Sequence, residues 1–204
     1  PPDSVFHKFG QSSCGVNFGS TVNSFGANLS VISPCGATFG SVAPIYISRA
    51  PVADFEMDEK VCVNKSVDIN DSSFGGRYVS SLNSNCSQPA SVIWTITPNT
   101  YVLNSGNLGT RIVANDPAQW IQGAKSLNVT FTKTGIYTIK QVVGNSIACR
   151  IDSLEQTICV DSLPVASLHL SHDTVCSGDS ITASFRESIL GICDTLDIRW
   201  DTLG

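Results

Sequence analysis

The sequence predicts an all-β protein built from tandem β-sandwich modules, and three observations support this fold class. Short apolar runs alternate with polar residues at period two and are bounded by Gly, Pro, Asn and Ser. One pattern of residues recurs at an offset of about 113 residues, which is the size of one sandwich domain. Eight cysteines, none in a metal-binding CxxC arrangement, fit an oxidising compartment and predict disulfides.

The repeat sets the expected domain organisation. Ala50-Pro51-Val52-Ala53-Asp54-Phe55 recurs as Leu163-Pro164-Val165-Ala166-Ser167-Leu168, and each copy is followed by Val-Cys and a Ser-led apolar run. Cys86 lies eight residues before Trp94, and Cys193 lies seven before Trp200. We therefore expect residues 1–49 to be the C-terminal part of a first immunoglobulin-like module, 50–162 a complete module and 163–204 the N-terminal part of a third.

Alternation places the strands of the complete module. A central core position is expected for Trp94, and the turn before Tyr137 is typical of the corner tyrosine of sandwich folds. The apolar faces of the strands at 127–132 and 136–143 should meet in the core. Residues 101–123 alternate poorly and predict irregular or edge structure. The expected strands are 52–57, 66–70, 91–97, 127–132, 136–143 and 156–160.

Chain direction restricts the disulfides inside the complete module. Cys62 and Cys159 fall at one end of a seven-stranded sandwich, and Cys86 and Cys149 fall in loops at the other. The two other pairings would join cysteines at opposite ends of strands ~17–20 Å long, whereas bonded Cα atoms must approach within ~7 Å. We therefore predict intramodule bridges between Cys62 and Cys159 and between Cys86 and Cys149.

The repeat extends this pairing to the partial modules. Cys35 matches Cys149 in the repeat, so Cys14 is its expected partner. By the same logic the partners of Cys176 and Cys193 should lie beyond residue 204.

Several motifs resemble PKD-like domains, a family of immunoglobulin-like sandwiches. They are Pro51-Val52-Ala53-Asp54-Phe55, Thr134-Gly135-Ile136-Tyr137-Thr138-Ile139 and Trp200-Asp201-x-x-Gly204. The similarity covers about residues 50–204 and departs from the family pattern after Trp94, where the Asp and Gly are missing. Tandem PKD-like modules with such cysteines are similar to those of giant Bacteroidota surface proteins, including SprB-type gliding-motility adhesins. This resemblance implies export by type IX secretion machinery.

A tripeptide motif for O-glycosylation points to the same phylum. Secreted proteins of Bacteroidota carry O-glycans at Asp-Ser/Thr followed by an aliphatic residue. The resemblance therefore implies candidate sites at Ser4, Ser153, Ser162, Thr174 and Thr195. Strand boundaries that follow turns also produce Asp-Ser-aliphatic, which is the structural alternative. The eukaryotic alternative is N-glycosylation at the Asn-x-Ser/Thr sequons of Asn28, Asn64, Asn70, Asn85 and Asn128.

Composition argues against most chemistry. A net charge of −5 without a run of basic residues argues against a nucleic-acid-binding surface. No apolar stretch is long enough for membrane insertion. We predict no catalytic residue, no metal site and no cofactor: no nucleophile elbow is present, and the three histidines lack a surrounding site. Residues 68–71 could alternatively ligate calcium through their carboxylates. Trp120 is either packed in a loop or exposed as a stacking platform.

The sequence therefore favours a non-enzymatic, structural and adhesive repeat of a large extracellular cell-surface protein, involved in surface adhesion and gliding motility. Its partners would be neighbouring modules of the same polypeptide, surface polysaccharide and the type IX secretion machinery. The alternative is a PKD-like accessory module of a secreted polymer-degrading hydrolase. A third hypothesis is a eukaryotic receptor ectodomain, which N-linked sugars would support.

Overall fold

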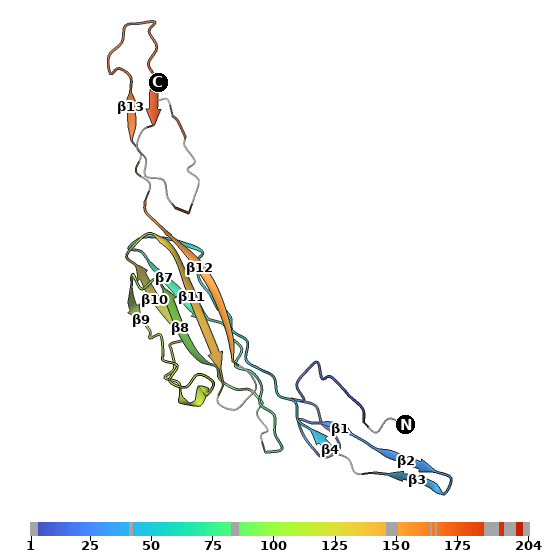
Figure 1. Ribbon diagram of the computed structural model, residues 1–204. Helices are drawn as coiled ribbons and strands as arrows, with labels where there is room; N and C mark the ends of the chain where they lie inside the picture. The colour runs from blue at the N-terminus through green and yellow to red at the C-terminus, as the bar shows by residue number, and fades with distance from the viewer. Residues whose placement is uncertain are drawn as a thin grey trace.

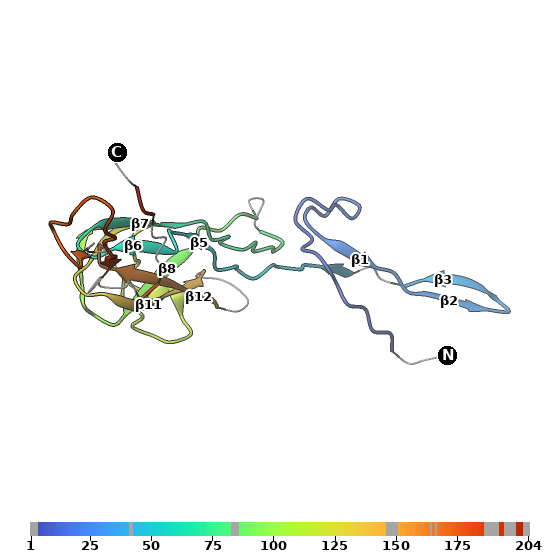
Figure 2. The same cartoon turned by 90° about the horizontal axis from the view of Figure 1, so that it is seen from above.

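A computed structural model describes residues 4–40, 43–82, 86–145, 151–163, 165, 167–185, 192–193 and 199–201. We call residues 1–49 the first segment, 50–162 the sandwich and 163–204 the last segment. Figure 1 shows these three parts following one another with the sandwich in the middle, and Figure 2 shows the first segment extending away from the sandwich.

Two four-stranded sheets form the sandwich, so the predicted all-β sandwich fold is confirmed. One sheet has the order β5 (Phe55–Glu56), β7 (Ser66–Asp71), β10 (Ser126–Phe131), β9 (Tyr101–Ser105). The other has the order β6 (Lys60–Cys62), β12 (Asp152–Asp161), β11 (Gly135–Gly144), β8 (Ser91–Thr97). All pairs are antiparallel except β6 with β12, which run parallel. This strand order is that of immunoglobulin-like domains.

The core lies between the two sheets and contains the faces that the alternation predicted. Every second residue of β10 is fully buried, namely Leu127, Val129 and Phe131, and the same holds for Tyr137, Ile139 and Val143 of β11. Trp94 of β8 is also buried, and its indole Nε1 donates to Ala124 O at 2.9 Å. Apolar burial on both inner faces therefore holds the sheets together.

Tyr137 is the predicted corner tyrosine. Its ring is buried against Phe131, with ring centroids 4.4 Å apart. The hydroxyl lies 3.0 Å from Lys133 O, four residues upstream, and 3.1 Å from Thr100 O. The phenol therefore ties the β10–β11 turn to the residue just before β9.

The stretch from 101 to 123 agrees with the predicted irregular or edge structure: residues 101–105 form the edge strand β9, and a 3-10 turn, η1 (Pro117–Gln119), follows it. Three strands differ from the prediction by more than one residue at an end. β5 is shorter than the predicted 52–57, and β12 begins at Asp152 instead of residue 156. The short strand β6 was not expected, because three residues are too few to show alternation and its partner β12 lies about a hundred residues away in sequence.

Two-stranded sheets occupy the flanking segments. In the first segment β1 (Phe25–Ala27) pairs with β4 (Ala43–Ile45), and β2 (Ser30–Ser33) pairs with β3 (Gly36–Phe39). In the last segment β13 (Leu168–Leu170) pairs with β14 (Ala183–Phe185). His169 lies on β13 and is exposed, as are Leu168 and Leu170 on either side of it.

Candidate functional site

The described residues form two disulfides, and each joins the sandwich to a flanking segment. Cys14 of the first segment is bonded to Cys86, with Cα atoms 5.9 Å apart. Cys159 of the sandwich is bonded to Cys193 of the last segment, with Cα atoms 6.0 Å apart. The bridges therefore cross the predicted boundaries instead of closing individual modules. The expectation of intramodule bridges was wrong for these four cysteines.

The predicted Cys62–Cys159 bridge is absent although both residues lie at the same end of the sandwich. In the parallel pairing of β6 with β12, Cys62 is opposite Asp161 and Cys159 is opposite Lys60. An offset of two residues on neighbouring strands separates the Cα atoms by roughly 8 Å, beyond the reach of a disulfide. Cys62 is instead a half-buried free thiol.

The other predicted pairs also differ from the structure. Cys35 lies at the exposed turn between β2 and β3 and is a free thiol, because Cys14 bonds across the junction. Cys86 is disulfide-bonded to Cys14, so it does not pair with Cys149. Cys149 itself lies outside the described residues. Cys193 has its partner within the chain rather than beyond residue 204, whereas Cys176 is an exposed free thiol.

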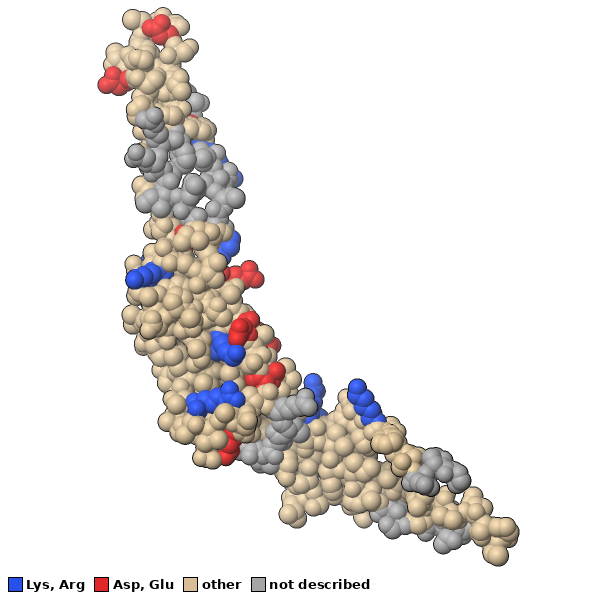
Figure 3. Space-filling view, viewed as in Figure 1, with Lys and Arg blue, Asp and Glu red and all other residues tan. Residues whose placement is uncertain are grey.

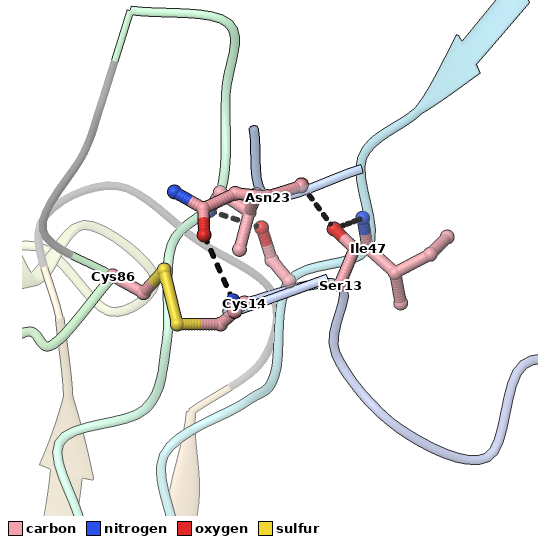
Figure 4. The surroundings of a disulfide bond; sticks show 8 residues. Ser13, Cys14, Asn23, Ile47 and Cys86 are labelled. Carbon is pink, nitrogen blue, oxygen red and sulfur yellow. Dashed lines mark hydrogen bonds between the residues drawn. A yellow bond between two sulfur atoms is a disulfide. The ribbon is translucent and has the colours of Figure 1, made fainter. Parts of the chain in front are cut away.

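A buried polar network holds Cys14 in place, as Figure 4 shows. The Ser13 hydroxyl donates to Asn23 O at 2.7 Å and accepts from Ile47 N at 3.0 Å. The Asn23 side chain accepts from the Gly15 amide at 2.8 Å, and both Ser13 and Asn23 are buried. Each hydrogen bond fixes backbone next to the bonded cysteine, so the disulfide is attached to an ordered loop.

On the sandwich side, two glycines permit close contact between backbone segments. Gly76 has a φ of +90°, and a Cβ there would lie 2.7 Å from Arg49 O. A Cβ on Gly75 would collide with Gln88 O. The Asn145 amide donates to Gly75 O at 2.8 Å and is itself buried. Glycine is therefore required at both positions: at Gly76 where the sandwich meets the end of the first segment, and at Gly75 where two parts of the β7–β8 loop meet.

The second junction is organised around the carboxylate of Asp161, the last residue of β12. Its oxygens accept from the amides of Ser162 at 2.8 Å, Ile192 at 3.1 Å and Cys193 at 3.1 Å. Desolvation by itself raises the pKa of Asp161, but the hydrogen bonds from Cys193, Ser162 and Ile192 outweigh it. The pKa therefore lies below its ordinary value. One carboxylate thus supports the polypeptide on both sides of the disulfide.

The structure places the candidate glycosylation residues in different surroundings. Ser4, Ser153 and Thr174 are exposed, but Ser153 lies inside strand β12, opposite Val142, instead of near a loop. Ser162 is half-buried, and its amide donates to Asp161. Thr195 lies outside the described residues.

The structure shows the surroundings of residues 68–71, the candidate calcium ligands, and of Trp120, the candidate stacking residue. Ile69 is a core residue, and the Asp71 carboxylate accepts from Lys125 Nζ at 2.5 Å and from the Gln141 amide at 2.7 Å. In the part of the chain that the structure describes, no three His, Cys, Asp or Glu residues gather as a metal site. Trp120 is buried against Ile93 and Val142, and its Nε1 donates to Val113 O at 2.7 Å.

The surface carries few charges, and they are mixed in sign. Figure 3 shows acidic and basic side chains scattered over the visible face, most of which is uncharged. Within the described ranges, no helix has the length and apolar character needed to cross a membrane. The two disulfides indicate an oxidising environment outside the cytosol.

No family model matches the chain, and no curated protein matches it either. Among solved structures, it resembles a cohesin module from a family 33 glycoside hydrolase of Clostridium perfringens ATCC13124. That superposition has a TM-score of 0.38 and 9% sequence identity, and it covers 55% of this chain and 97% of the cohesin module. We carry no function over from this likeness.

Proposed function

We propose that this chain is a covalently jointed spacer: a non-catalytic segment of a large secreted cell-surface adhesin that holds a binding region away from the cell. The observation that carries the proposal is that both disulfides join successive parts of the chain. A joint with one peptide connection and one disulfide has two covalent links, so it bends less freely than a single linker.

The disulfides also define which residues carry tension. A force applied to the two ends passes from Cys14 through the first disulfide to Cys86, along the sandwich to Cys159, and through the second disulfide to Cys193. Residues 15–85 and 160–192 are bypassed. Strands β5, β6 and β7 are therefore not pulled directly, while β8 to β11 and β12 up to Cys159 bear the load.

The finer assignment, a gliding-motility adhesin exported by type IX secretion, is supported by the PKD-like motifs and by the Asp-Ser/Thr-aliphatic tripeptides. Exposed Ser4, Ser153 and Thr174 are the positions where O-glycans would be attached most readily. Such glycans would shield a surface that has few charges of its own.

Pulling single molecules between two reference domains tests the spacer function. Under oxidising conditions the bypassed segments should not extend. Reduction should add about 240 Å for the Cys14–Cys86 loop and about 110 Å for the Cys159–Cys193 loop, at 3.3–3.6 Å per residue of the 72- and 34-residue separations. Unchanged contour length on reduction would show that the joints are not covalent and would remove the basis of the proposal.

The surface location is tested on the source cells. An antibody raised against the sandwich should label intact cells, and external protease should abolish the labelling. Intact-mass analysis of the native chain should show added hexose-type masses at Ser4, Ser153 or Thr174. Labelling only after lysis contradicts the surface assignment, and unmodified peptides at all three residues contradict the glycan assignment.

A further inference from the structure

Beside the first disulfide lies a recess with a volume of about 570 Å³, which is within the range of small-molecule sites. Cys14 contributes to its wall, together with backbone and side chains of both the first segment and the sandwich. Its polar lining includes Gln11, Ser12 and Ser48, and its two charged lining residues are Arg49 and Arg77. The recess therefore presents hydrogen-bond donors and positive charge, and no carboxylate is among its described lining residues.

The two arginines are held opposite each other by their own backbone. Arg49 and Arg77 form an antiparallel bridge with N···O distances of 2.8 and 2.9 Å in the two directions. Residues directly opposite in such a pair project their side chains to the same side, and like charges in that position are mutually destabilising. Among the described residues neither arginine has an acidic partner. An anion placed between them would relieve this repulsion.

The scaffold behind the pair is rigid. Arg77 also forms a bridge with Ser87, the residue after the disulfide-bonded Cys86. The Arg49 guanidinium lies over the ring of Phe74, 5.1 Å from its centroid, which orients its plane while leaving N–H groups at its edge. The guanidinium of Arg49 and the backbone of Arg77 are thus positioned before a ligand arrives.

An aromatic recess adjoins the cationic one. It has a volume of about 350 Å³ and shares Phe9, Gly10 and Gln11 with its neighbour. Phe9 stacks on Phe25 with centroids 5.1 Å apart and contacts the His7 ring edge-on at 4.6 Å. A ligand that spans both recesses needs an anionic group, such as a carboxylate, at one end and an apolar ring face at the other.

We propose that the junction binds an acidic polysaccharide through its uronate residues, with carboxylates between Arg49 and Arg77 and a sugar face on Phe9. Uronic acids combine the two required features in one residue. This inference deepens the adhesive part of the proposed function and rests on it only for the source of the polysaccharide. It concerns a different property from load bearing, so the two can fail separately.

Calorimetric titration of the oxidised chain with oligogalacturonate is the test, and its methyl ester is the matched ligand because it keeps the rings and removes the charge. The free acid should bind at least about tenfold more tightly than the ester, since charged hydrogen bonds are among the stronger ones. Raising NaCl from 50 to 500 mM should weaken binding of the acid. Equal affinities for acid and ester would overturn the proposal without any substitution being made.

Variants identify the residues. Arg77→Gln and Arg49→Gln should each weaken binding about tenfold, and Phe9→Leu should weaken both ligands. Arg111→Gln is the charge-matched control, because Arg111 lies on Trp120 in another part of the sandwich. Equal losses in Arg111→Gln and Arg77→Gln would show non-specific attraction and contradict the site.

Inorganic sulfate is the control for the saccharide. If it binds as tightly as oligogalacturonate, the site is a simple anion site and the saccharide proposal is wrong. A chain that fails here yet shows the expected contour lengths remains a spacer.

Discussion

Cys86 and Cys193 occupy equivalent positions of the sequence repeat, each shortly before a tryptophan, and each is bonded to the segment that precedes its own: Cys86 to the first segment and Cys193 to the sandwich. Their partners are not equivalent: Cys14 lies in an N-terminal loop, whereas Cys159 lies in strand β12. In both joints, therefore, one of the two bonded residues is the cysteine that lies shortly before a tryptophan. The preceding segment supplies a cysteine from a loop in one joint and from a strand in the other.

Tryptic mapping without reduction distinguishes this arrangement from the intramodule pairs that the sequence predicted. Cleavage after Lys and Arg puts Cys14 and Cys35 together in residues 9–49 and leaves Cys86 in residues 78–111. We expect these two peptides to be disulfide-linked, and residues 151–186 to be linked to residues 187–199. Links from residues 61–65 to 151–186, or from 78–111 to 141–150, would restore the original pairs.

Serine variants separate the joint from the free thiols. Cys86→Ser should free Cys14 for alkylation and lower the free energy of unfolding by about 2–4 kcal/mol, because the first loop is no longer closed. Cys35→Ser is the control and should change neither the peptide map nor the stability. A stable, unaltered map for Cys86→Ser would contradict the cross-junction bridge.

Local patterns predicted the sandwich core, whereas the joints depend on distant parts of the chain. Alternation identified Leu127, Tyr137 and Trp94 as core residues because burial of every second residue is a local property of a strand. The same pattern did not predict that Gln141 would be fully buried on the core face of β11. Its amide donates to Asp71, and such a tertiary partner leaves no local signal.

The disulfide prediction was wrong for a different reason. It assumed that each module closes its own bridges, and it placed Cys62 and Cys159 at the correct end of the sandwich. The parallel register of β6 on β12 then offsets them by two residues. The Arg49–Arg77 pair was also not predicted, because a bridge between the end of the first segment and the β7–β8 loop produces no periodic pattern in the sequence.

Removing one hydroxyl tests the corner tyrosine. Tyr137→Phe should lower the free energy of unfolding by about 1–3 kcal/mol, because the backbone oxygens of Lys133 and Thr100 lose the one hydroxyl donor that they share in a partly buried turn. Urea denaturation followed by tryptophan fluorescence measures the change. Tyr101→Phe makes the same chemical change in neighbouring β9 and should have little effect. Equal effects of the two substitutions would argue against a corner role.

Two valines on paired strands test where the core lies. Val129 of β10 is fully buried, and Val102 of β9 is 52% exposed. Val129→Ala should cost about 2 kcal/mol through lost burial and the cavity left behind, whereas Val102→Ala should cost less than about 0.5 kcal/mol. Thermal unfolding of the oxidised chain is the measurement. A larger loss at Val102 would mean that the sheets pack through their other faces.

Acidification should weaken the hydrogen bonds of the second junction before the sandwich core is affected, while the Cys159–Cys193 disulfide stays in place. Because the pKa of Asp161 is lower in the folded chain than in the unfolded one, its carboxylate stabilises the folded junction above the unfolded pKa. That contribution is lost as pH falls through the lower, folded pKa, which places the change below about pH 4.

Amide chemical shifts report this titration directly. The amides of Ser162, Ile192 and Cys193 donate to the carboxylate, so their signals should move together with one midpoint below the ordinary value of an aspartate. Asp161→Asn keeps an acceptor oxygen but cannot ionise, so in this variant the three signals should stay constant over the same range. Amides of β11 provide the internal reference, because they are hydrogen-bonded within a sheet. A shared midpoint at or above the ordinary aspartate value would show that the three amides do not hold the ionised carboxylate.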